Sequence, residues 1–428
     1  MDAPALRLRF RTARLPLPTN LLSIAAGHEP MVWLRRGGGT VGLGQAAAFE
    51  TSGPQRFEQA ARWFDQLVTN ATIEGPSQMP GMAPLALGAF SFSDSSPTPS
   101  RLVVPAVAVS RRRGAEWVTT AGVEEAAEPA AALAELVEAA RTVKPGQPGR
   151  PAMTEAAGHH PADAWPGVIG EALDAIGHRV VDKVVLARDV AAVASQPVNL
   201  LAVIRQLTTA YRDCWTYCLD GLVGATPELL IRAARGLVTS RVLAGTIRRT
   251  GNDVADLARA GALARSSKDL EEHQLAVESV VQTLRPFTEE LSVPDAPSVL
   301  HLPNVMHLAT DVVGDLKGRN GNAPSSLELA AALHPTAAVC GTPREAAYEL
   351  LEHLEGTDRG RYSGPVGWLA ADGAGEWGIA LRCAQFDTAR QRARLWAGGG
   401  IVAASVPADE LAETEAKLAP MRQALGLA

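Results

Sequence analysis

The stretch VVDKVVLARDV, residues 180–190, predicts a buried β-strand. Most of its apolar side chains are β-branched, and such residues favour strands. Lys183 lies in the middle of this apolar run. A lysine at a strand centre commonly extends its ammonium group to the surface or pairs with a nearby carboxylate, here Asp182. The alternative is that Lys183 is held out of water to act as a base near pH 7, which costs roughly 4 kcal/mol of lost charge stabilisation.

The composition excludes several classes of partner. The chain has 428 residues, a net charge of −6, 46% hydrophobic residues and 20% charged residues, which is typical of a globular protein with a large core. A chain with this net negative charge does not attract the phosphate backbone of a nucleic acid, so we expect no nucleic-acid partner. The longest apolar runs are too short to cross a bilayer, and the first residues, MDAPALRLRFRTARLP, lack the apolar centre of a secretory signal. We therefore expect a cytoplasmic protein with no membrane partner.

Two regions differ in their pattern of elements. Residues 1–164 contain short strand candidates and helical patterns, and they end in a loop rich in proline and glycine at 142–165. The strand candidates there are VWLRR (32–36), GTVGLG (39–44), LALGAFSF (85–92) and LVVPAVAVSRRR (102–113), and the helical patterns cover 56–70 and 128–143. We expect this N-terminal region to complete the sheets of the region at 165–428.

Residues 165–428 predict an α+β fold. Helical patterns cover 166–177, 199–211, 253–266, 268–290 and 409–426. Between them, the strand candidates WTYCLDG (215–221), ELLIRAARG (228–236) and GLVTSRVLAGT (236–246) follow one another with no helix in between. Neighbouring strands without crossover helices favour large mixed sheets flanked by helices over a doubly wound parallel fold.

Glu228 is a candidate proton donor. It follows Thr-Pro in GATPELLIR (224–232) and begins an apolar strand. The simplest interpretation is an exposed strand edge. The functional alternative is a carboxylic acid against apolar walls, where burial raises its pKa and lets it donate a proton.

Two helices offer carboxylates for a metal ion. Glu272 lies in SKDLEEHQLAVESVVQTL (267–284), where acids also suit the helix dipole. Glu410, Glu413 and Lys417 share one face of the closing helix, where Glu413 and Lys417 are spaced for an ordinary i,i+4 ion pair. One carboxylate from each helix is what Mg²⁺ needs, with waters and substrate oxygens as its other ligands. Spacing alone does not show whether the two helices meet.

Ten motifs in order from about residue 165 onward resemble the chorismate-utilising enzymes. This family includes isochorismate synthases, salicylate synthases, anthranilate synthase large subunits and aminodeoxychorismate synthases. The motifs are KVVLAR (183–188), GATPELLIR (224–232), LAGT (243–246), SKDLEEH (267–273), NVMHLATDVVG (304–314), LHPTAAVCGTP (333–343), RYSGPVGW (361–368), WGIALR (377–382), AGGGIV (397–402) and ELAETEAKL (410–418). The first 160 residues carry little of the resemblance.

The resemblance implies a fold of two stacked, mostly antiparallel sheets with helices outside, and it implies roles for particular residues. Lys183 matches the base that activates water, and Glu228 matches the acid that protonates the departing 4-hydroxyl group. Glu272 and Glu413 match the Mg²⁺ ligands, with Glu410 as an acid near the metal. The substrate-binding positions that match are Gly245, Thr246, His307, Tyr362, Arg382, Gly398, Gly400 and Lys417.

Two residues separate the branches of this family. Anthranilate synthases use ammonia and have a non-basic residue at the position of Lys183. Aminodeoxychorismate synthases carry a lysine where this chain has Ala244. The resemblance therefore implies water addition, as in an isochorismate synthase with chorismate as substrate, no glutaminase subunit and a monomeric state. A salicylate synthase, which also eliminates pyruvate, and an inactive chorismate-binding partner protein are the alternatives.

One position departs from the family pattern. The family usually has AGAG where this chain has AGGG (397–400), so that Gly399 replaces an alanine. The additional glycine loosens the backbone at this point but removes no hydrogen-bond donor.

Overall fold

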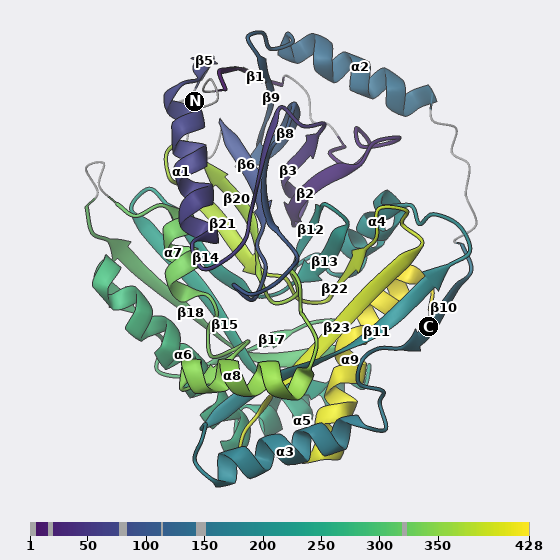
Figure 1. Cartoon of the computed structure of the whole chain (residues 1–428), viewed down its shortest axis with the longest axis vertical. Coiled ribbons are helices and arrows are strands. Elements are labelled where there is room, and N and C mark those ends of the chain that lie inside the picture. The colour runs from purple at the N-terminus through teal and green to yellow at the C-terminus, as the bar shows by residue number, and fades with distance from the viewer. Residues whose placement is uncertain are drawn as a thin grey trace.

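Two large β-sheets form the framework of the molecule (Figure 1). The computed structural model describes residues 6–15, 20–76, 84–112, 114–142, 151–318 and 323–427. Within these ranges every strand pairing is antiparallel except that between β1 and β5. Helices flank the sheets, so the predicted α+β class is confirmed.

The larger sheet has 13 strands among the described residues, in the order β10-β11-β23-β22-β13-β12-β2-β3-β8-β9-β1-β5, with β19 also paired to β11. Its strands are β1 Leu8–Arg14, β2 Pro30–Arg35, β3 Gly38–Leu43, β5 Thr72–Glu74, β8 Val107–Arg112, β9 Ala115–Val123, β10 Met153–Ala157, β11 Lys183–Ala194, β12 Trp215–Leu219, β13 Leu222–Thr226, β19 Gly341–Thr342, β22 Cys383–Phe386 and β23 Arg392–Ile401.

The smaller sheet has ten strands in the same part of the chain, in the order β16-β18-β15-β14-β21-β20-β6-β7-β4, with β17 also paired to β18. Its strands are β4 Ala47–Thr51, β6 Leu85–Ala89, β7 Ser100–Val104, β14 Leu229–Ala234, β15 Leu237–Arg248, β16 Thr288–Ser292, β17 Ser298–His301, β18 Val305–Leu316, β20 Pro365–Ala370 and β21 Gly375–Ile379. Strands from before residue 165 therefore belong to both sheets. The predicted boundary between residues 1–164 and residues 165–428 stays a prediction.

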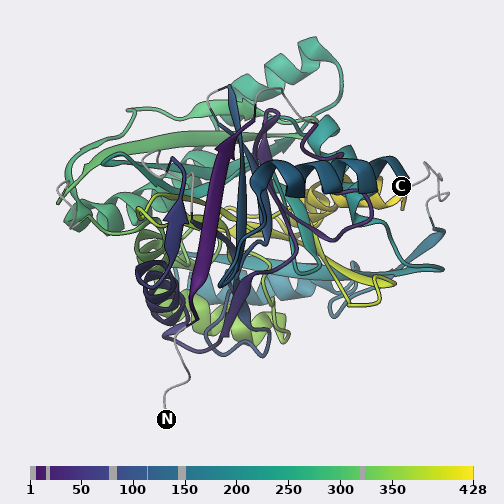
Figure 2. The same ribbon diagram turned by 90° about the horizontal axis from the view of Figure 1, so that it is seen from above.

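The helices cover the outer faces of the two sheets. α6, α7 and α1 lie on the side of the smaller sheet, and α3, α4, α8 and α9 lie against the larger one (Figure 1). Seen from above, α2 crosses the near end of the molecule, where it contacts β1 and β9 (Figure 2). The helices are α1 Arg56–Thr69, α2 Pro129–Thr142, α3 Trp165–Gly177, α4 Leu200–Ala210, α5 Asp253–Leu263, α6 Ser267–Leu284, α7 Ser326–Leu333, α8 Arg344–Glu355, α9 Pro407–Leu425 and the short 3₁₀ helix η1 Arg285–Phe287. None of the helices described here is long and apolar enough to span a membrane.

Prolines explain two differences from the predicted elements. The helix predicted at 268–290 ends at Leu284, because Pro286 cannot continue the backbone hydrogen bonding, and the chain then enters β16. Pro105 likewise divides LVVPAVAVSRRR into β7 and β8, which belong to different sheets. Arg113 of that stretch lies outside the described residues.

Further differences lie at sheet edges and strand starts. β11 begins at Lys183 rather than at Val180, which is exposed. The loop predicted at 142–165 contains β10, which pairs with β11, and residues 143–150 of this loop lie outside the described residues. Most of β10 is exposed, so its sequence carries no alternating apolar signal. Strand β1 was not predicted from the sequence either, although alternate residues of this strand are buried.

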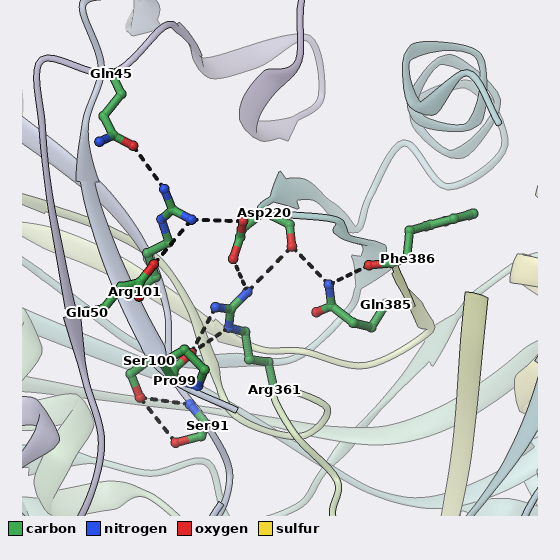
Figure 3. A network of polar contacts seen from close by, with 10 residues as sticks. All are labelled: Gln45, Glu50, Ser91, Pro99, Ser100, Arg101, Asp220, Arg361, Gln385 and Phe386. Atoms are coloured by element: carbon green, nitrogen blue, oxygen red, sulfur yellow. Dashed lines mark hydrogen bonds and ion pairs between the residues drawn. The ribbon is translucent and has the colours of Figure 1, made fainter. Parts of the chain in front are cut away.

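A polar network joins the two sheets next to the turn between β12 and β13 (Figure 3). Asp220, in that turn, accepts hydrogen bonds from Arg101 of β7 at 3.0 Å and from Arg361 at 2.8 Å. The buried Arg361 also donates two hydrogen bonds to the carbonyl oxygen of Pro99, at 2.8 and 3.0 Å. The network therefore connects Arg361, the residue before Tyr362, to both sheets.

Candidate active site

Lys183 is fully buried at the start of β11. Its Nζ lies 3.3 Å from Oε1 of Glu272 and donates a 3.4 Å hydrogen bond to the carbonyl oxygen of the same residue. The side chain therefore neither reaches the surface nor pairs with Asp182, and both of those simple expectations are wrong. The backbone of β23 lies close against this side chain, since a Cβ atom built on Gly400 would lie 2.9 Å from Cε of Lys183. A buried amine needs such a partner, and Glu272 provides it.

A buried ion pair supports the outer edge of the same strand. β19 covers this edge at Lys183 and Val184, and β10 covers it from Val190 onward. Between them, Glu355 accepts a 2.8 Å hydrogen bond from the N–H of Ala187, and Arg359 donates a 2.7 Å bond to the carbonyl oxygen of Val185. Glu355 and Arg359 bind each other through two hydrogen bonds. Their side chains thus replace a neighbouring strand.

The carboxylates of α6 and α9 converge over the glycine run of β23. A Cβ atom built on Gly400 would lie 2.1 Å from Oε1 of Glu272. One built on Gly399 would lie 3.1 Å from Oε2 of Glu410 and 3.5 Å from Oε1 of Glu413. The structure therefore brings together the two helices whose meeting the sequence left open, and the small residues leave room for their acids.

Lysines neutralise this acidic group. Lys417 lies 2.5 Å from Oε1 of Glu413 and donates a 2.7 Å hydrogen bond to the carbonyl oxygen of Gly398. Lys268 lies 2.7 Å from Oε1 of Glu410. Burial, with the nearby charge of Glu413, raises the pKa of Glu410. Among the described residues no group of three or more His, Cys, Asp or Glu side chains is placed to hold a metal ion by itself.

Glu228 is buried where β13 leads into β14. Burial raises its pKa to about 8, against an opposing effect of the positive charges of Lys183, Arg382 and Lys417. The expectation of an exposed strand edge is therefore wrong. A carboxyl group with this pKa is largely protonated at neutral pH and can donate a proton.

Arg382, His307 and Thr246 form a hydrogen-bonded chain. Nη2 of Arg382 lies 3.1 Å from Nε2 of His307, and Nδ1 of His307 lies 3.1 Å from Oγ1 of Thr246. Burial, together with Arg382 and Lys417, holds the pKa of His307 well below its usual range, so the ring is neutral and Nε2 accepts from the guanidinium. Nε of Arg382 is buried and has no hydrogen-bond partner. This free donor suits an incoming carboxylate.

Tyr362 completes one wall of the site. Its ring stacks on Trp396 with centroids 5.6 Å apart and planes at 6°. Burial raises the pKa of the Tyr362 hydroxyl group to about 12, so the hydroxyl keeps its proton and can donate it in a hydrogen bond.

These residues surround one cavity with about 570 Å³ of unfilled space, counting its open mouth. Ten of the twelve predicted site residues line it: Glu228, Gly245, Thr246, Glu272, His307, Tyr362, Arg382, Gly398, Gly400 and Lys417. The other two stand directly behind this wall, with Lys183 paired to Glu272 and Glu413 paired to Lys417.

Arg359 also lines the cavity but was not predicted from the sequence. It stands only two residues before the motif RYSGPVGW, and this nearness was the available signal. Lys268, which pairs with Glu410, was missed as well, although it lies inside SKDLEEH.

The fold and this site define the class of the protein. The family model described as "Chorismate binding enzyme" matches residues 25–426, and the chain belongs to this family. The "Salicylate biosynthesis isochorismate synthase" of Pseudomonas aeruginosa is 34% identical, covering 89% of this chain and 82% of that protein. "Isochorismate synthase DhbC" of Bacillus subtilis is 38% identical, covering 62% of this chain and 68% of that protein. The solved menaquinone-specific isochorismate synthase MenF of Escherichia coli superimposes with a TM-score of 0.79 and 26% identity, covering 98% of this chain and 95% of that one.

Proposed function

We propose that this protein is an isochorismate synthase, an isomerase that converts chorismate to isochorismate with Mg²⁺ as cofactor. The observation that carries the proposal is a buried amine and a buried carboxyl group at one site: Lys183 stands behind the cavity wall, and Glu228, whose pKa is raised to about 8, lines the cavity. A lysine held out of water and a carboxyl group that keeps its proton are suited to act as base and acid. The relatives named above carry the same activity in their names.

In the proposed reaction Lys183 takes a proton from a water molecule that attacks C2 of the ring. The ring double bonds shift, and Glu228 protonates the oxygen that leaves C4 as water. The proton then returns from Lys183 to Glu228, so that water is taken up and released in equal amounts. Positioned proton transfers of this kind typically contribute about 10²–10⁴-fold each.

The other predicted residues bind and orient the substrate in this proposal. Arg382, with its unpartnered Nε, and Tyr362, with a hydroxyl group that keeps its proton, suit the enolpyruvyl carboxylate. Neutral His307 fixes the guanidinium of Arg382 through its 3.1 Å hydrogen bond. Gly245, Thr246, Gly398, Gly400 and Lys417 complete the pocket wall.

The carboxylates of Glu272 and Glu413 fit a magnesium ion. They come from two helices, they converge over Gly399 and Gly400, and they supply the hard oxygen ligands that Mg²⁺ prefers. When bound there, Mg²⁺ supplies positive charge to anchor the ring carboxylate of chorismate. Glu410 supports this arrangement, and its pairing with Lys268 balances part of the local negative charge.

The test is to incubate the purified protein with chorismate and Mg²⁺ and to separate the products by chromatography. We expect a mixture of chorismate and isochorismate that a chelator abolishes. Salicylate plus pyruvate would move the protein to the salicylate synthase branch, and binding of chorismate without turnover would make it the inactive partner protein.

We expect a monomeric cytoplasmic enzyme whose product serves menaquinone or siderophore synthesis.

Replacing Lys183 tests the proposed base. Lys183→Ala should lower kcat by about 10²–10⁴-fold, because no other group takes the proton from water. Lys317→Ala is the control, since Lys317 is exposed, its ammonium group donates to the carbonyl oxygen of Pro286, and it does not line the cavity. Near-normal turnover by a folded Lys183→Ala protein would show that the base is another group.

A further inference from the structure

Trp396 of β23 stands directly behind the candidate active site. The pairing of β23 with β11 is regular, and side chains two residues apart on a strand share a face, so Trp396 lies on the same side of β23 as Gly398 and Gly400. Those two glycines line the cavity, whereas Trp396 does not line it and is only 5% exposed. The open floor that the glycines leave therefore ends at a large buried ring, which no step of the proposed reaction uses.

The indole of Trp396 is the flat surface against which Tyr362 packs, with ring centroids 5.6 Å apart and planes at 6°. The backbone at Tyr362 is held separately. Its N–H donates to the carbonyl oxygen of Arg359 at 3.0 Å, and the N–H of Ser363 donates to that of Ala380 at 2.9 Å. These bonds do not restrain the side-chain torsions of Tyr362. The stack with Trp396 is therefore the contact that sets the direction of the Tyr362 ring.

Trp396 is in turn held by Arg394, which precedes it by two residues on β23. The guanidinium carbon of Arg394 lies 5.1 Å from the ring centroid of Trp396, within the range of a cation–π contact. Arg394 donates hydrogen bonds of 2.6 Å to the carboxylate of Asp189 and to the hydroxyl group of Thr357. A chain of contacts thus runs from a fixed guanidinium group through the indole to the ring of Tyr362.

The indole N–H group of Trp396 does not explain why a tryptophan occupies this position. Nε1 of Trp396 is buried and has no hydrogen-bond partner. A buried donor without an acceptor is unfavourable, and a phenylalanine would avoid that cost. The large ring area that reaches Tyr362 is the feature that a tryptophan adds here.

We propose that Trp396 is a positioning residue for substrate binding, which holds the ring of Tyr362 so that its hydroxyl group meets the enolpyruvyl carboxylate beside Arg382. This inference rests on the proposed function, because chorismate is the ligand that carries this carboxylate. The carboxylate takes no part in the bond changes at C2 and C4, so a contact with it binds the substrate and the transition state alike. Loss of such a contact raises KM and leaves kcat nearly unchanged.

Calorimetric titration with chorismate in the presence of Mg²⁺, together with steady-state kinetics, tests this proposal. The titrated proteins also carry Glu228→Gln, so that chorismate is consumed slowly. Trp396→Leu should raise both Kd and KM for chorismate at least about tenfold, because a small misplacement of a binding group has a large effect. The same variant should lower kcat less than about twofold. Trp396→Met, whose flexible side chain fills irregular gaps, replaces Trp396→Leu if that variant does not fold.

Two variants serve as comparisons for Trp396→Leu. Trp396→Phe keeps a ring against Tyr362 and removes the unpartnered N–H, so its Kd should stay within about threefold of the wild-type value. Trp63→Leu is the matched control, since Trp63 stacks on Phe49 with centroids 5.5 Å apart and planes at 14° and does not line the cavity. Its loss should leave the Kd for chorismate unchanged.

Tyr362→Phe separates positioning from a general effect on packing. This variant keeps the stacked ring and removes the hydroxyl group that Trp396 is proposed to direct. In a protein that already carries Tyr362→Phe, Trp396→Leu should therefore raise the Kd for chorismate by less than about a further twofold.

The outcomes distinguish this inference from the proposed function. If the wild type converts chorismate but Trp396→Leu leaves Kd unchanged, or raises it equally in the Tyr362→Phe protein, the positioning role is overturned and the activity stands. If the wild type binds chorismate without turnover and Trp396→Leu weakens that binding through Tyr362, the positioning role stands and the activity does not. A wild-type protein that does not bind chorismate overturns both.

Discussion

Glu228 illustrates how burial changes the chemistry of one ordinary side chain. Because burial raises its pKa to about 8, its acid form persists at neutral pH and is lost above it. If Glu228 is the proton donor, kcat should fall as the pH rises through about 8. Glu228→Gln should lower kcat by about 10²–10⁴-fold and abolish this alkaline limb. A pH–rate profile of the wild-type enzyme and the variant checks both effects, and an alkaline limb that persists in the variant would assign it to another group.

The same pKa shift has a consequence for stability. A carboxyl group whose folded pKa lies above its ordinary value of 4.5 binds its proton more tightly in the folded state. Its contribution to stability is fully present below pH 4.5 and is lost as the pH rises through about 8. Denaturant titrations at several pH values should therefore show a smaller decline between these limits for Glu228→Gln than for the wild type.

Gly399 and Gly400 are adjacent, yet they should respond very differently to a methyl group. At Gly400 an added Cβ would lie 2.1 Å from Oε1 of Glu272, and the carboxylate would have to move. At Gly399 the closest atom would be Oε2 of Glu410 at 3.1 Å, a contact that a small shift relieves. We expect Gly400→Ala to weaken Mg²⁺ activation at least about tenfold and Gly399→Ala to change it only a few-fold. Magnesium titrations of activity measure both, and equal effects of the two variants would contradict the proposed ligand geometry.

At the scale of the element, strand β11 depends on side chains to complete its hydrogen bonding. Glu355 and Arg359 are both almost fully buried and bind the strand edge between β10 and β19. Glu355→Gln leaves a buried guanidinium without its counter-charge and should lower the free energy of unfolding by about 3–5 kcal/mol. Urea unfolding followed by circular dichroism measures this loss.

A surface ion pair provides the control for that experiment. Glu58 and Arg62 form an exposed i,i+4 pair on α1. Glu58→Gln should cost no more than about 0.5 kcal/mol, because solvent screens such pairs. If Glu355→Gln lowers the unfolding free energy no more than Glu58→Gln does, the stability of β11 does not depend on the buried pair.

At the scale of the whole molecule, the network around Asp220 joins the two sheets (Figure 3). Arg361→Ala would leave the carbonyl oxygen of Pro99 and the carboxylate of Asp220 without their buried donor. We expect a loss of about 2–4 kcal/mol in unfolding free energy. KM for chorismate should also rise, because Arg361 precedes Tyr362 in the pocket wall. Arg101→Ala, which removes the more exposed donor to Asp220, should cost less in the same unfolding experiment. Equal losses would show that the connection between the sheets does not depend on burial.

The sequence by itself determined the α+β class, most of the elements at 165–428 and ten of the residues that line the cavity. These features follow from local periodicity and from motifs whose residue types and order the chain displays directly. The ends of elements were less predictable where an edge strand such as β10 is mostly exposed, since its sequence carries no apolar alternation.

Only the tertiary structure decided how those residues act together. It buried Lys183 against the backbone of β23, and it paired the lysine with Glu272 rather than with Asp182. It placed α6 and α9 with their carboxylates over the same glycines, and it buried Glu228 deeply enough to raise its pKa to about 8. Burial and distances between groups remote in sequence depend on the packing of the whole chain, and spacing along the sequence does not contain them.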